Sequence, residues 1–153
     1  MLAHSTLAGA VFPATRALAW NVRVGLGTDV AGGSHPGLLP QCVNAATMSR
    51  VLDDGVNAQR PADARGVSGS RIDIVAAFHL ATKGGVDILD IPCGLLQPGR
   101  AFDAIIVDLG RPGSSLRVWH DLDDEARIFE KIVRLATPEE ISSVWVAGRR
   151  VSG

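Results

Sequence analysis

The sequence has 153 residues, of which 46% are hydrophobic, and its 15 basic and 16 acidic residues give a net charge of −1. A near-neutral chain with interspersed charges carries neither a nucleic-acid footprint nor a polybasic membrane patch, so we expect no nucleic-acid or membrane partner. Pro13 and Arg16 interrupt the apolar N-terminal stretch, and no apolar run reaches the about 20 residues that cross a bilayer. We therefore expect a cytoplasmic protein.

The two cysteines indicate a structural role. Cys42 and Cys93 lie far apart and lack C-x-x-C spacing, which argues against a zinc knuckle or a redox pair. We expect both side chains to be small apolar fillers in a reducing compartment.

Helical and extended patterns follow one another in the first part of the chain. Residues 8–20 favour a short helix with Pro13 near its start. Residues 22–28 alternate apolar side chains and favour a buried strand. Apolar residues at helical spacing then predict a helix over 38–54, which Gly55 would stop.

A polar loop over 56–70 separates this helix from the next helical pattern. Ser70 is the expected N-cap of the next helix. The helix itself is expected from Ile74 onward and should end at Gly84-Gly85. A short helical turn to Asp90 follows and ends before a proline.

The pattern changes from Cys93 onward and becomes richer in strands. An apolar run over 102–107 predicts a buried strand, and spacing over 125–135 predicts a helix. The acidic residues just before that helix are expected to interact favourably with the positive, N-terminal end of its dipole. Ala147-Gly148 is expected to form the turn of a β-hairpin near the end of the chain. We therefore expect two domains, residues 1–92 and 93–153.

Asp29 is the main candidate for chemistry. It ends the apolar stretch and opens the glycine-rich loop Val30-Ala-Gly-Gly33. In α/β enzymes, functional groups gather at the carboxyl ends of parallel strands, so Asp29 is a candidate metal ligand or general base. The alternative is that this aspartate merely caps a helix or orders a turn.

Two known motifs that resemble this region do not match it. A dinucleotide-binding fingerprint needs a glycine where Val30 stands. A nucleophile elbow, G-x-S-x-G, needs a glycine where Pro36 follows Gly32-Gly33-Ser34-His35.

Several segments together resemble guanine deaminases, which belong to the metal-dependent amidohydrolase superfamily. The segment Val24-Gly-Leu-Gly-Thr-Asp-Val-Ala-Gly-Gly33 is similar to the last barrel strand of that family. The other similar segments are Gly9-Ala-Val-Phe-Pro13, Phe78-His-Leu-Ala-Thr-Lys-Gly-Gly85, residues 95–108 and Val144-Trp-Val-Ala-Gly-Arg-Arg-Val151. They occur in the order of the family's C-terminal part, and this collinearity is more specific than any one motif.

The resemblance implies an α/β fold that is a C-terminal fragment of an amidohydrolase (β/α)₈ barrel with part of its flanking small β-sandwich. Residues 1–92 would hold the last barrel strand and the helices after it, and residues 93–153 the β-rich segment with one helix. A complete barrel of this TIM type needs about 250 residues. We therefore expect a truncated gene model, a fragment, or one piece of a split enzyme.

The resemblance also implies an activity: hydrolytic deamination of guanine to xanthine and ammonia, by an aminohydrolase acting on cyclic amidines in purine catabolism. It implies a divalent metal, with zinc expected, a purine substrate, and a homodimer when the protein is complete. Asp29 would be metal ligand and catalytic proton shuttle. No substrate-binding residue can be assigned, because the family's purine-gripping residues lie upstream of this sequence.

The histidines do not complete a metal site. The family takes other ligands from a His-x-His pair and from middle strands, and none of the histidines in this sequence forms such a pair. His79 is expected on a helix and His120 in a solvated loop, while His35 lies near Asp29 at a position without a family ligand. His4 has no settled alignment, since the Cys-Pro and Ser-Asn expected after it are missing.

Two alternatives stay open at this point: another purine or triazine amidohydrolase, and a non-catalytic remnant or interaction module. Because Asp29 is one plausible metal ligand and no histidine has the spacing to add two more, we expect that residues 1–153 alone do not deaminate guanine.

Overall fold

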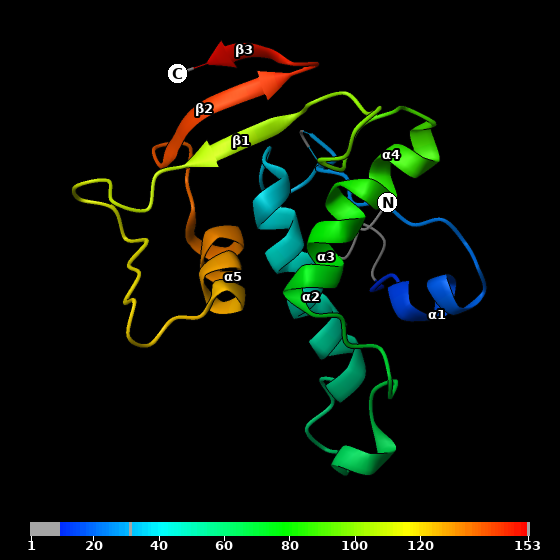
Figure 1. Cartoon of the computed structure of the whole chain (residues 1–153). Coiled ribbons are helices and arrows are strands. Elements are labelled where there is room, and N and C mark those ends of the chain that lie inside the picture. The colour runs from blue at the N-terminus through cyan, green and yellow to red at the C-terminus, as the bar shows by residue number, and fades with distance from the viewer. Residues whose placement is uncertain (1–9, 31, 153) are drawn as a thin grey trace. The chain divides into compact units, whose positions relative to one another are not determined.

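The computed structural model describes residues 10–30 and 32–152 of the chain (Figure 1). Two compact units divide it, Met1–Leu89 and Asp90–Gly153. His4 and the start of the expected first helix lie outside the described residues. None of the described helices has the length and apolar character needed to cross a bilayer.

The first unit is helical. Its elements are α1 (Ala14–Ala19), α2 (Leu38–Asp54), a short 3₁₀ helix η1 (Ala62–Ala64), α3 (Ile74–Ala81) and α4 (Lys83–Leu89). Helices α2 and α3 pack on each other, and both contribute fully or nearly fully buried small residues, such as Cys42, Ala46 and Ala77. Cys42 is completely buried, as expected, and this burial raises the pKa of its thiol to about 11.

The predicted helix over 38–54 is confirmed at both ends. Gly55 ends α2 with a positive φ of 68°, a conformation that suits glycine. A β-carbon on Gly55 would also lie 2.5 Å from the amide nitrogen of Gly66, so the two ends of the loop between them approach at backbone distance.

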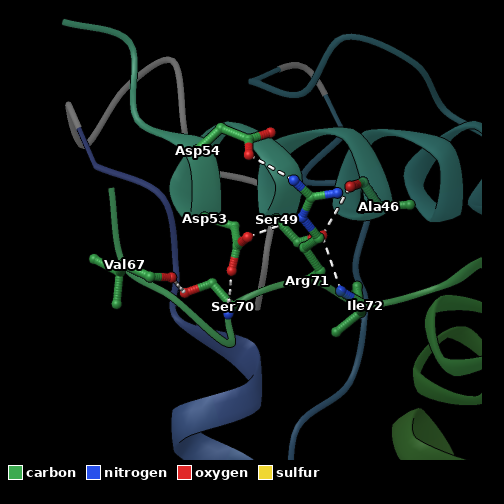
Figure 2. Close-up of polar contacts among 8 residues, drawn as sticks. All are labelled: Ala46, Ser49, Asp53, Asp54, Val67, Ser70, Arg71 and Ile72. Atoms are coloured by element: carbon green, nitrogen blue, oxygen red, sulfur yellow. Dashed lines mark hydrogen bonds and ion pairs between the residues drawn. The ribbon is translucent and has the colours of Figure 1, made fainter. Parts of the chain in front are cut away.

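Polar contacts close that loop on the end of α2 (Figure 2). Arg71 donates to Asp53 and to Asp54, with its Nε 2.8 Å from Asp53 Oδ2. Asp53 Oδ1 also accepts from the amide of Ser70 at 2.9 Å. These donors lower the pKa of the Asp53 carboxyl, the Arg71 hydrogen bond being the largest cause.

Two predicted helix boundaries are wrong. The N-cap of α3 is Asp73 rather than Ser70, because the Asp73 carboxylate accepts from the amide of Ala76 at 2.7 Å. The break after α3 falls at Thr82, whose hydroxyl donates to the carbonyl of Phe78 at 2.9 Å. Gly84-Gly85 therefore lies inside α4 instead of ending a helix.

The strand predicted over 22–28 is also absent from the described residues. Strand ladders need a neighbouring strand, and here the segment bonds to helical residues. The amide of Val22 donates to Ala17, and the amide of Leu26 donates to Leu80 at 3.0 Å. The expected burial holds for Val24, which is 4% exposed, but not for Val22, which is 48% exposed.

The second unit is a small antiparallel sheet with one helix among its described residues. It contains β1 (Ala104–Val107), α5 (Glu125–Leu135), β2 (Ile141–Val146) and β3 (Arg149–Ser152), with sheet order β1-β2-β3. The helix predicted over 125–135 is confirmed. Asp124 caps it by accepting from the amide of Arg127 at 2.8 Å, which agrees with the role expected for the acidic residues there.

The final hairpin is confirmed as well. The burial expected for the strand over residues 102–107, which corresponds to β1, is wrong. Ala147 and Gly148 have φ of 50° and 78°, the left-handed pair of a tight hairpin turn. On β1, Ile105 and Ile106 are 44% and 52% exposed. Their side chains point to opposite faces of the sheet, so neither face of β1 is fully covered within the described residues.

Candidate active-site segment

Asp29 lies at the start of a tight backbone turn. Its φ is 48°, in the left-handed region that few residues other than glycine, asparagine and aspartate adopt. The Asp29 carbonyl accepts hydrogen bonds from the amides of Gly32 at 2.9 Å and Gly33 at 2.6 Å. The turn that we considered as an alternative is therefore real, and it is made by the backbone.

Gly33 is required by this turn. A β-carbon built on Gly33 would lie 1.9 Å from the carbonyl oxygen of Thr28, far inside contact distance. Any other residue at Gly33 would force the turn open and move Asp29, which is half-buried. The glycine-rich loop therefore fixes the local conformation of the candidate carboxylate.

The loop that follows is fastened to the first turns of α2. Gln41 donates from Nε2 to the carbonyl of His35 at 3.0 Å, and Asn44 donates from Nδ2 to the hydroxyl of Ser34 at 3.1 Å. The same Asn44 amide also donates to Gln41 Oε1 at 3.3 Å. These polar residues on α2 were missed in the sequence, although Gln41 and Asn44 stand three positions apart in a predicted helix, which would have placed them on one face.

None of the described histidines belongs to a group of metal-binding side chains. His35 is exposed, and its Nδ1 accepts from the amide of Gly37 at 2.9 Å. His79 is exposed on α3 and His120 is exposed in a turn, as expected. Across residues 10–30 and 32–152, no three His, Cys, Asp or Glu side chains are grouped so that they could hold a metal ion.

Carboxylate chemistry at Asp29 suits a divalent cation, but a zinc site in an enzyme usually takes three protein ligands. The described residues supply one candidate. They do not fit a complete metal site by themselves, so no reaction step can be derived through a metal ion from these residues alone.

Comparison with known proteins shows which family the chain belongs to. Residues 2–151 match the model of the amidohydrolase family. The chain belongs to the amidohydrolase family. This agrees with the α/β fold class and with the resemblance found in the sequence.

Two of the relatives that are similar to this chain are probable guanine deaminases. A probable guanine deaminase of Deinococcus radiodurans is 32% identical over 95% of this chain and 30% of its own length. A probable guanine deaminase of Schizosaccharomyces pombe is 31% identical over 98% of this chain and 27% of its own length. The chain therefore spans about 30% of the length of these relatives.

A solved structure supports the same fold. The crystal structure of a guanine deaminase from C. acetobutylicum, with guanine bound in its active site, superposes with a TM-score of 0.75 and 19% identity. It covers 97% of this chain, which in turn covers 32% of that protein. The chain thus shares its fold with about a third of that protein.

Proposed function

We propose that this chain is the C-terminal part of an amidohydrolase that hydrolyses guanine to xanthine and ammonia. The observation that carries the proposal is the collinear similarity to probable guanine deaminases over at least 95% of the chain. The fold shared with a guanine-bound enzyme supports it. In the whole protein, the first unit would complete a (β/α)₈ barrel and the second would belong to the flanking β-sandwich.

Asp29 would be the catalytic carboxylate of this protein. Water attack on the ring carbon of guanine requires a group that accepts the water proton and returns it toward the departing ammonia. Aspartate suits this role, because few rotatable bonds separate its carboxylate from a backbone that the turn at Gly33 holds.

A divalent metal ion, which we propose is zinc, would supply hydroxide near neutral pH by lowering the pKa of water to about 7. Asp29 would be one of its ligands, and the other ligands would come from parts of the family fold that this chain does not span. We further propose a cytoplasmic homodimer acting in purine catabolism.

Fusion to a relative tests this proposal. Residues 2–151 would replace the matching C-terminal part of the Deinococcus radiodurans protein, and guanine loss and xanthine formation would be followed by ultraviolet absorbance. We expect guanine turnover that a chelator abolishes. Turnover of adenine or an aminotriazine in place of guanine would favour another amidohydrolase.

The parent relative, purified and assayed in parallel, is the positive control. A folded fusion protein without turnover of any of these substrates would contradict an enzymatic role and favour a non-catalytic remnant.

A further inference from the structure

The segment that leads to Asp29 touches helix α4 backbone to backbone. A β-carbon on Gly84 would lie 2.6 Å from the carbonyl oxygen of Val24. From the other side, a β-carbon on Gly25 would lie 2.9 Å from the α-carbon of Gly85 and 3.1 Å from its nitrogen. No side chain separates the two backbones here, and interiors packed this closely transmit small displacements.

Two hydrogen bonds flank this contact. Arg23 donates from Nη1 to the carbonyl of Asp87, in α4, at 2.9 Å. The amide of Leu26 donates to the carbonyl of Leu80, in α3, at 3.0 Å. Residues 23–26 are thus fixed to the α3–α4 pair at both ends and in the middle. We call this arrangement the glycine clasp.

The contacts change abruptly beyond the clasp. A β-carbon on Gly27 would meet nothing within 4 Å. Two residues later the chain enters the turn in which Gly32 and Gly33 bond to Asp29. The turn sets the shape of the backbone around Asp29, and the clasp joins the segment just before that turn to α3 and α4.

We propose that Gly84 is a positioning residue for Asp29: its missing side chain lets α4 seat the backbone at Val24 and so sets the location of the carboxylate. This rests on the proposed function only where turnover is concerned. The structural part holds for the chain whatever it catalyses. It also explains why Gly84 stands inside a helix, where a glycine costs about 1 kcal/mol relative to alanine.

The neighbouring glycine gives a matched control. A β-carbon on Gly85 would meet only the carbonyl oxygen of Leu80, at an ordinary 3.8 Å. Gly84→Ala and Gly85→Ala make the same chemical change at adjacent positions of α4. Only the first drives a side chain into the segment that carries Asp29.

The first test uses the purified 153-residue chain and two-dimensional NMR. We expect Gly84→Ala to move the amide resonances of Asp29 and Gly33, and Gly85→Ala to leave them in place. An unchanged Asp29 resonance in folded Gly84→Ala would overturn the proposal. If Gly84→Ala does not fold, Arg23→Gln decides instead, because Arg23 is exposed: a moved Asp29 resonance supports the clasp, and an unmoved one contradicts it.

The second test uses the fusion protein described above, with rates normalised to folded protein. Misplacement of a catalytic group by about 1 Å can lower the rate about 10²-fold. We expect Gly84→Ala to lower kcat by about that factor with KM little changed, and Gly85→Ala to retain normal turnover. Equal kcat in the two variants would overturn the positioning role, whereas an inactive parent fusion would count against the proposed function and leave the NMR result to decide the clasp.

Discussion

The hydroxyl of Ser49, in α2, accepts a hydrogen bond at 3.0 Å from the amide of Ile72, which lies just before α3. The same hydroxyl donates to the carbonyl of Ala46 at 2.8 Å (Figure 2). Ser49 is 6% exposed and Ile72 is 7% exposed, so water has little access to either group. This bond fixes the start of α3 against α2 beside the Arg71 ion pairs.

Ser49→Ala should therefore destabilise the first unit. The substitution leaves the buried Ile72 amide without an acceptor, and an unsatisfied buried donor costs about 1–3 kcal/mol. Chemical denaturation would measure the loss of unfolding free energy. Ser68→Ala, at an exposed serine in the preceding loop, is the matched control and should change stability little. Equal stability of the two variants would contradict this account.

The hairpin turn offers a stabilising substitution. Ala147 has a φ of 50°, and a left-handed residue with a β-carbon costs about 1–2 kcal/mol. Because asparagine followed by glycine suits this turn, Ala147→Asn should raise the unfolding free energy by up to about 1 kcal/mol. Ala136→Asn, at an ordinary φ of −64°, should give no such gain. A loss of stability in Ala147→Asn would show that the turn does not carry this strain.

Glu140 should make the second unit sensitive to acid. This glutamate is 3% exposed. Hydrogen bonds from the Ser114 hydroxyl, and then from the hydroxyl and amide of Thr137, lower the pKa of its carboxyl from 4.5 to about 2. A carboxyl whose pKa is lower in the folded state than in the unfolded state stabilises the fold at any pH above its unfolded-state pKa. That stability should be lost as the pH falls from about 4.5 toward about 2.

Thermal unfolding followed across that pH range would measure this effect. Glu140→Gln should be less stable at neutral pH and should lose the part of the pH dependence that Glu140 causes. Glu139→Gln, at an exposed neighbouring glutamate, should behave like the parent chain. Identical pH profiles for Glu140→Gln and the parent would contradict the assignment.

The sequence predicted those elements whose local signals were complete. Helix α2 has apolar spacing and a glycine stop, and α5 has an acidic cap, so both have the expected bounds. Two of the failures concern partners distant in sequence. A strand pattern over 22–28 does not make a strand without a neighbour to pair with. Gly84-Gly85 looked like a stop signal because its real partner, the backbone at Val24 and Gly25, lies about sixty positions away.

The candidate site shows the same division. The turn at Asp29 could be predicted from local sequence, because Asp29, Gly32 and Gly33 make it themselves. The catalytic role of Asp29 stays a prediction. The contacts that hold the segment before that turn against the helices could not be predicted from the sequence. The bond from Leu26 to Leu80 depends on how α3 packs in three dimensions, and no local pattern encodes it.

The 153-residue chain by itself should not deaminate guanine. The described residues bring no group of three metal-binding side chains together, and one carboxylate cannot hold a metal ion in a water-activating geometry. The measurement is xanthine formation by the purified chain with added zinc. Xanthine formation that a chelator stops would overturn this prediction.

The central claim is that Asp29 is the catalytic carboxylate of a guanine-hydrolysing amidohydrolase, and one comparison tests it most directly. The fusion protein would be assayed with Asp29→Asn and, as a matched control, with Asp63→Asn at an exposed aspartate of η1. Loss of a general acid–base group typically lowers a rate about 10²–10⁴-fold. We expect a loss of that size for Asp29→Asn and normal turnover for Asp63→Asn. Near-normal turnover of guanine by Asp29→Asn would contradict the claim.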